Sequence, residues 1–213
     1  MSRLTYDHRR VLNFTDAVFS IALTLLILEV NIPSAEAFHR TSFWDIIASI
    51  QLELIGFIVS FFVIALYWVA HLRIGKYVEE IDHPLLWRHI LLLFFVVLLP
   101  FSTAFYVTGF ATAGPFMLYC TNLAMIGLLH LLIVKKVTSQ SAMEELTVKY
   151  EMTRAYVALA VFVFTGLLSM ALPFWSRFGF GLVFILQPIF TKRLKRKKEK
   201  EKEKEKEKEN ERK

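Results

Sequence analysis

The chain has 213 residues, of which 55% are hydrophobic, and its mean hydropathy is +0.48. Its formal net charge of +6 comes entirely from the tail 192–213, which holds 13 Lys/Arg and 7 Glu, so the charge does not indicate a nucleic-acid partner. The apolar residues are gathered into blocks long enough to cross a bilayer, which excludes a soluble globular domain. The single cysteine, Cys120, excludes an intrachain disulfide.

Six apolar segments are predicted to cross the membrane as α-helices, because a bilayer offers no water to backbone polar groups. In chain order these spans are about 11–31, 44–72, 88–107, 115–134, 154–172 and 174–191. Little more than Pro173 separates the last two, which predicts a tight hairpin, and Pro100 and Pro188 can kink the third and sixth. We therefore expect an all-α integral membrane protein with one six-helix domain over 1–191.

The basic residues predict the orientation of these spans. They precede the first span and fill the second and fourth loops, at Arg3, Arg9, Arg10, Arg73, Lys76, Arg88, Lys135, Lys136, Lys149 and Arg154. The alternate loops carry only Arg40 and Arg177. Both termini are therefore expected in the cytoplasm, and the Lys/Glu tail 192–213 is expected to be a charged, low-complexity cytoplasmic segment.

The first span carries an aspartate, which costs about 2.5–3.5 kcal/mol at the centre of a bilayer on insertion scales. Asp16 lies six residues after Arg10, about 9 Å along a helix. An antiparallel second span brings Trp68 and His71 to a similar depth, and both rings can donate a hydrogen bond to the carboxylate. Two other interpretations stay open: Asp16 caps the helix start while His71 lies among headgroups, or the pair relays protons.

A helical wheel places an apolar stripe away from this acid. At 100° per residue from Ile21, the stripe lies within about 60° of zero, whereas Asp16 falls at about 220°. We call it the Ile21 stripe; it comprises Phe14, Ala17, Ile21, Thr24, Leu25 and Leu28. The two sides of the first span therefore face different surroundings, and the stripe faces lipid, another helix or a central axis.

The first span also carries a recognisable motif. The run Arg10-Val-Leu-Asn-Phe14-Thr15-Asp16 resembles the Arg-x-x-x-Phe-Ser-Asp signature of the transmembrane protein 175 family of potassium channels, with Thr15 in place of serine. The later Tyr-Trp68-Val-Ala-His71 resembles the Trp/His motif of the family's second helix. Length and span number are similar to the single-repeat bacterial branch, and the resemblance covers roughly 1–191.

The resemblance implies a homotetramer in the bacterial inner membrane, with the first helix of each subunit lining a central pore. Carried over by position, the hydrophobic constriction falls on Ile21, with Leu25 and Leu28 in the layers above, and the potassium preference falls on Thr24. The family's packing network falls on Phe14, Thr15, Asp16, Trp68 and His71. The expected function is a potassium-selective channel, leak-type conduction included, with potassium as permeant ion, membrane lipid as surroundings and no cofactor.

Two alternatives to a potassium channel stay open from the residues. A secondary transporter needs broken helices and often shows repeats, whereas the first span is unbroken and no repeat is detected; Pro100 and Pro188 keep this alternative open. A proton-conducting membrane protein is the other alternative. An enzyme is not expected, because the six histidines lack HExxH-type spacing and the serines lack a nucleophile elbow. No metal site is expected.

Overall fold

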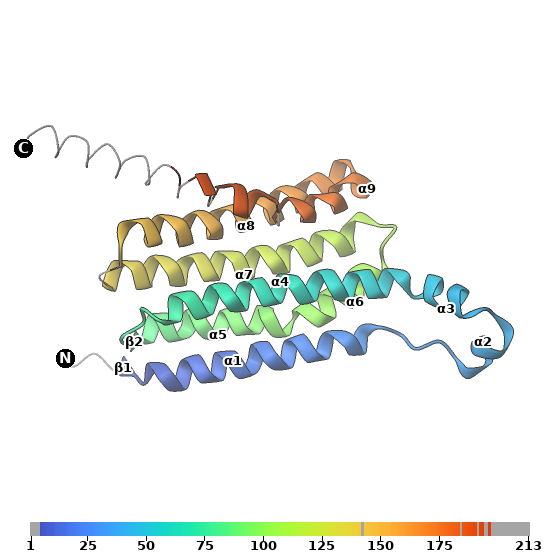
Figure 1. Cartoon of the computed structure of the whole chain (residues 1–213), viewed down its shortest axis with the longest axis horizontal. Helices are drawn as coiled ribbons and strands as arrows, with labels where there is room; N and C mark the ends of the chain where they lie inside the picture. The colour runs from blue at the N-terminus through green and yellow to red at the C-terminus, as the bar shows by residue number, and fades with distance from the viewer. Residues whose placement is uncertain (1–4, 142, 184, 191, 194–195, 197–213) are drawn as a thin grey trace, which may run out of the picture.

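The computed structural model describes residues 5–141, 143–183, 185–190, 192–193 and 196 as a bundle of long helices lying side by side (Figure 1). Apart from three residues, the predicted tail 192–213 lies outside the described part of the chain. The helices and strands, in chain order, are β1 (Thr5–Tyr6), α1 (His8–Leu25), the 3-10 helix η1 (Leu26–Glu29), α2 (Ala35–Arg40), α3 (Phe43–Ser49), α4 (Gln51–Gly75), β2 (Ile81–Asp82), α5 (His83–Val97), α6 (Leu99–Thr108), α7 (Ala113–Gln140), α8 (Glu145–Ala171), α9 (Pro173–Ser176) and the 3-10 helix η2 (Arg177–Phe180).

Within the described residues, five helical segments are long and apolar enough to cross a membrane. They are His8–Glu29, Gln51–Gly75, His83–Thr108, Ala113–Gln140 and Glu145–Ala171, and each overlaps a predicted span. A shorter apolar helix, Phe174–Phe190, covers the position of the sixth prediction. The chain is therefore a helical, multi-pass membrane protein, as its composition indicated.

Two predicted spans are interrupted in the structure. The second was expected from residue 44, but Ile50 leaves the helical conformation (φ −107°, ψ 9°) and separates α3 from α4. In the third, α5 ends at Val97 and α6 begins at Leu99, directly before Pro100. Proline has no backbone N–H to donate into the preceding turn, which explains the break at the position where a kink was predicted.

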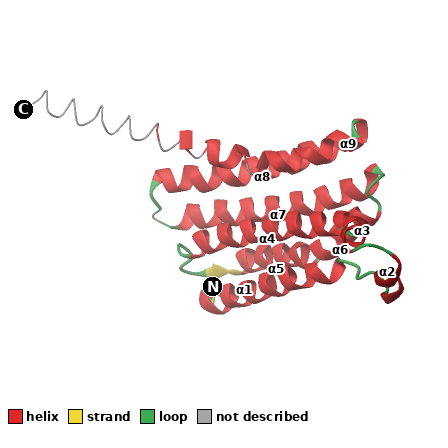
Figure 2. Cartoon of the chain, turned by 45° about the vertical axis from the view of Figure 1, so that its right-hand side comes forward, coloured by secondary structure: helices red, strands yellow, loops and turns green. Residues whose placement is uncertain are grey.

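A small β-ladder, not foreseen from the sequence, joins the start of the chain to the α4–α5 connection (Figure 2). Asp82 in β2 caps α5 by accepting from the Leu85 N–H at 2.9 Å, and it pairs with Lys136 of α7 at 2.9 Å. Burial acts to raise the pKa of Asp82, but the bonds from Lys136 and the Leu85 N–H outweigh it and hold this pKa below its ordinary value. The carboxylate therefore stays charged and ties three segments together.

The helices are arranged so that α1 lies at one edge of the bundle. Helix α7 packs against α5, α6 and α8, whereas α1 packs mainly against α4 and α5. Of the five spans, α7 is the most buried and α1 the least. The β-ladder and the α7–α8 connection lie at one end, and α2, α3 and α9 lie at the other (Figure 1). This separation of the loops agrees with their predicted alternation.

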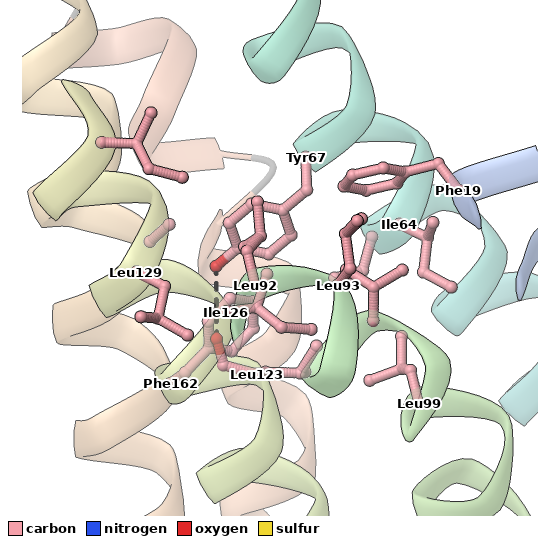
Figure 3. Close-up of a cluster of buried hydrophobic side chains, with 14 of the residues drawn as sticks. Phe19, Ile64, Tyr67, Leu92, Leu93, Leu99, Leu123, Ile126, Leu129 and Phe162 are labelled. Atoms are coloured by element: carbon pink, nitrogen blue, oxygen red, sulfur yellow. Dashed lines mark hydrogen bonds between the residues drawn. The ribbon is translucent and has the colours of Figure 1, made fainter. Parts of the chain in front are cut away.

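The core fills the space between α1, α4, α5, α7 and α8 with apolar side chains. Figure 3 shows Phe19 of α1 reaching toward the cluster that contains Tyr67 and Leu93. The Tyr67 hydroxyl donates to the Leu123 carbonyl at 3.4 Å, the dashed line in the same view. Cys120 is buried here as a free thiol, as expected of a single cysteine in a helix core.

One ion pair crosses the core from α4 to α8. Arg73 donates through Nε and Nη2 to the two carboxylate oxygens of Glu151, at 2.7 and 3.3 Å. The Glu151 side chain is 4% exposed and that of Arg73 is 29% exposed. A bidentate pair of this kind fixes the relative rotation of the two helices as well as their contact.

We predict that Glu151→Gln lowers the free energy of unfolding, because it leaves the Arg73 guanidinium without its counter-charge. Breaking a buried pair costs about 3–5 kcal/mol, and the partial exposure of Arg73 puts this loss at or below the lower end. The measurement is an unfolding titration in mixed detergent micelles. The control is Glu145→Gln, because the Glu145–Lys149 pair on α8 is 80% and 61% exposed; an equal loss in both variants would contradict the prediction.

Candidate functional site

Helix α1 has a buried face and an exposed apolar face. Thr15, Phe19 and Ala22 are buried against the rest of the subunit. On the other side, Phe14 and Ile21 are 61% and 56% exposed. The Ile21 stripe is therefore a surface that the other described parts of the subunit leave uncovered, and the angular separation predicted by the wheel is confirmed.

The α-helix that carries the Ile21 stripe ends earlier than predicted. The α-helix ends at Leu25, and the next turn, Leu26–Glu29, tightens to a 3-10 helix. An unbroken α-helix over 11–31 was therefore wrong in its last turns, since a 3-10 turn has three residues instead of 3.6. Leu25 and Leu28 nevertheless remain exposed, at 38% and 74%.

Thr24 presents a hydroxyl on the same exposed face. Its Oγ1 donates to the Ile21 carbonyl oxygen at 2.8 Å, within its own helix. A hydroxyl has one hydrogen to donate and two lone pairs to accept with, so this bond uses the proton and leaves the oxygen free. An exposed oxygen of this kind can serve as a ligand to a cation.

Asp16 is held on the inner side by a single cross-helix bond. The indole Nε1 of Trp68 on α4 donates to the Asp16 carboxylate at 3.0 Å, which confirms the predicted pairing. The neighbouring Thr15 is fully buried and its hydroxyl donates to the Val11 carbonyl at 2.9 Å. A directional bond to a charged acceptor is stronger than a neutral one, so it orients α1 against α4.

His71 does not join Asp16, contrary to the prediction. It is 2% exposed, and neither ring nitrogen has a hydrogen-bond partner among the described residues. Its ring instead stacks on Phe19 of α1 at 6.1 Å and meets His89 of α5 edge-on at 5.2 Å. The depth of His71 could be predicted from its position along α4, but the direction of its side chain could not, and its neighbour His89 comes from a third helix, α5.

The remaining signature residues line a groove between α1 and α5. Arg10 and Phe14 contribute from α1, and Leu86 and Ile90 contribute from α5, around a volume of about 220 Å³. Arg10 is exposed at the end of the bundle where α1 begins. Phe14 therefore lies with the exposed stripe in the single subunit and not in the Asp16–Trp68 contact.

Polar residues elsewhere in the spans join helices to one another. Ser60 of α4 bonds to Thr103 of α6 at 2.9 Å and to Tyr119 of α7 at 2.8 Å. Ser102 of α6 accepts from the Asn122 amide of α7 at 3.0 Å. Neither serine could be paired from sequence alone, because the partners lie 20–59 positions away in the chain. Such bonds are typical of helix association in membranes.

The described residues contain no group of three or more histidine, cysteine, aspartate or glutamate side chains placed to hold a metal ion. Of the buried histidines, His71 and His89 contact each other, whereas His130 lies edge-on to Tyr67 at 6.1 Å. The site therefore consists of an apolar, hydroxyl-bearing helix face, with the partly buried Asp16 on the opposite side of the same helix.

Comparison with known proteins finds relatives that are named as potassium channels or as proton channels. A potassium channel of Streptomyces collinus is 36% identical over 95 residues, which are 45% of each chain. A potassium channel of a Chryseobacterium strain is 23% identical over 187 residues, which cover 86% of this chain and 93% of the relative. A Danio rerio protein named endosomal/lysosomal proton channel TMEM175 is 26% identical over 133 residues, 61% of this chain and 25% of the relative.

The fold is shared with a solved structure. The crystal structure titled as a lysosomal potassium-selective channel TMEM175 homolog from Chamaesiphon minutus superposes with a TM-score of 0.74. The superposition covers 88% of this chain and 97% of that one at 24% sequence identity, so it shows the fold. By contrast, the sequence matches to the potassium channels of Streptomyces collinus and Chamaesiphon minutus span less than half the length of those relatives.

The family model described as "Endosomal/lysosomal potassium channel TMEM175" matches residues 10–100. This match begins at Arg10, the first residue of the signature, and extends over α1, α4 and α5, which build the Asp16 contact and the His71 cluster. With the named relatives and the shared fold, this match shows that residues 10–100 of the chain are similar to the TMEM175 family.

Proposed function

We propose that this chain is the subunit of a potassium-selective cation channel in which four copies of α1 surround a central pore. The observation that carries the proposal is the exposed Ile21 stripe on the least buried span, at the edge of the bundle. The bacterial relatives are named potassium channels, which supports the choice of ion. An exposed stripe that carries a hydroxyl is suited to line a passage shared between copies.

Ile21 is proposed as the gate. Four isoleucine side chains around an axis make a narrow apolar ring, and such a ring stops ions by excluding water. Leu25 and Leu28 extend this apolar lining beyond Ile21 in the direction of the α2 segment, since both remain exposed on the same side of the chain. Movement of α1 away from the axis would hydrate the ring and allow conduction.

Thr24 is proposed to contribute the ion preference. Its hydroxyl oxygen is one turn of the helix beyond the Ile21 ring and keeps its lone pairs free for a cation. Four such oxygens replace part of the hydration shell of an ion that passes in a partly dehydrated state. Asp16 acts differently in this proposal: bound to Trp68 on the inner side, it orients the helix instead of contacting the ion.

The proposed membrane is the inner membrane, with the α7–α8 connection in the cytoplasm. Arg73, Lys76, Lys135 and Lys136 all lie toward the end of the bundle that carries the β-ladder. The positive-inside rule therefore assigns that end to the cytoplasm, and the start of the chain with it.

Proton conduction is the second candidate. The Danio rerio relative is named a proton channel, and this chain buries His71 and His89 next to each other behind α1.

Purified protein in liposomes separates the candidates: potassium, sodium and caesium gradients are compared with a pH gradient read by an internal dye. Electrodiffusive potassium current supports the channel, proton flux alone supports the alternative, and saturable coupled uptake indicates a transporter.

We predict that Ile21→Ser raises potassium flux into liposomes about tenfold or more, which corresponds to removing about 1.4 kcal/mol from the barrier. A small hydroxyl side chain both widens and hydrates the ring. The control is Ile58→Ser, because Ile58 is 49% exposed on α4, away from the stripe. Unchanged flux in the Ile21 variant would remove this residue from the gate.

We predict that Thr24→Val lowers the potassium-to-sodium permeability ratio about two- to tenfold, since each variant subunit loses one contact of hydrogen-bond strength. Valine keeps the shape and removes the oxygen. The measurement is the reversal potential under bi-ionic conditions. Thr121→Val is the control, because Thr121 is an exposed threonine of α7 that also donates to its own helix. An unaltered reversal potential in Thr24→Val rejects the assignment.

We predict that Asp16 and Trp68 are energetically coupled by about 1.5–3 kcal/mol, the range for a hydrogen bond to a charged group. The measurement is a double-mutant cycle of Asp16→Asn and Trp68→Phe, followed by unfolding in detergent and by the oligomer mass. Trp44→Phe is the control, since Trp44 is 75% exposed. Additive losses in the cycle would show that the contact does not orient α1.

A further inference from the structure

An apolar pocket lies at the end of the bundle opposite the β-ladder. It has a volume of about 260 Å³ and lies between α4, the α6–α7 connection and the segment that follows α8. Ile55 and Val59 form one wall, and Phe174 and Phe178 form the other. Its volume exceeds that of the about 150 Å³ apolar cavity known to bind benzene or xenon, so the pocket has room for an apolar ligand.

The mouth of this pocket carries one charged side chain, Arg177. It is half-buried, its Cζ lies 4.1 Å from the centroid of the Phe110 ring, and its Nη2 donates to the Phe110 carbonyl. Its Nε is buried and has no hydrogen-bond partner among the described residues. Within the same residues no carboxylate forms an ion pair with Arg177, in contrast to Arg73 on α4. The site therefore has a positive charge that the subunit does not compensate.

Two exposed aromatic side chains next to Arg177 indicate a position at the membrane interface. Trp175 and Phe178, on either side of it, are 67% and 66% exposed, and tryptophan is enriched where a helix meets the headgroups. A charge at this level next to an apolar hollow matches a molecule that is anionic at one end and apolar at the other. A guanidinium favours phosphate in particular, because its planar fork donates two parallel bonds.

We propose that this pocket binds a membrane phospholipid, with its phosphate on Arg177 and one acyl chain between Phe174, Phe178, Ile55 and Val59. The polar floor is already satisfied, since Ser60 bonds to Thr103 and Tyr119. The acyl chain therefore meets apolar walls and no uncompensated donor. The lining residues come from segments other than α1, so the site is independent of the proposed pore and of its ion.

The test measures lipid retention by native mass spectrometry after purification from nanodiscs of phosphatidylglycerol and phosphatidylcholine. We expect the wild-type subunit to retain phospholipid, and Arg177→Gln to reduce the retained phosphatidylglycerol about tenfold, because it removes the charge-assisted bond. Val59→Trp fills the apolar wall, leaves the arginine in place, and is expected to reduce retention of both lipids. Arg177→Lys is expected to fall between wild type and Arg177→Gln.

The control is Arg40→Gln at the same end of the bundle, where Arg40 is 75% exposed and pairs with Glu36 at 2.6 Å. We expect this variant to retain lipid as the wild type does. Unchanged retention in both Arg177→Gln and Val59→Trp overturns the proposal, as does an equal loss in Arg40→Gln. Displacement of the lipid by excess inorganic phosphate alone also overturns it, since that result indicates a free-anion site. Because the readout is bound lipid, a failure of the channel proposal leaves it unaffected.

Discussion

The rotation of α1 about its own axis determines which of its faces the subunit covers and which it leaves open. The angular positions of residues on one helix are fixed relative to each other, so burying Thr15 and Phe19 turns Ile21 outward. The bond from the Trp68 indole to the Asp16 carboxylate adds direction to this burial, since it ties one side of α1 to α4. The contact that accommodates a costly acid thus also determines which face of α1 the subunit leaves exposed.

The other intramembrane polar groups have a different role. Between helices in lipid there is little hydrophobic driving force, so close packing and cross-helix hydrogen bonds specify how they pair. Ser60, Thr103 and Tyr119 join three helices at one point, and Arg73 with Glu151 joins two more. Because these groups satisfy one another, their polar atoms serve contacts between helices, whereas the Thr24 hydroxyl lies on the exposed face of α1. In the proposed channel it is this face that contacts the permeating ion.

Single-helix properties could be predicted from the sequence, whereas contacts between helices could be predicted only in part. The spans, the position of the Ile21 stripe and the Asp16–Trp68 pair follow from periodicity and depth, because both are set along one chain segment. The neighbours of His71 depend on the rotation of α4 about its own axis and on the packing of α5, which carries His89, against it. Neither of these can be deduced from the spacing of residues along one helix. The break at Ile50 and the two-residue strands could not be predicted from the sequence either, since no proline or alternating pattern marks them.

The two ends of the molecule balance charge in different ways, and this contrast connects the fold to its surroundings. Near the β-ladder, Lys136 has Asp82 and Arg73 has Glu151, so cations from two helices have their counter-charges within the subunit. At the opposite end Arg177 rests on an aromatic ring and a backbone carbonyl, without a carboxylate among the described residues. An aromatic face attracts a cation but does not neutralise it. In the proposed lipid site, the phosphate of a phospholipid supplies the counter-charge that the described residues do not give to Arg177.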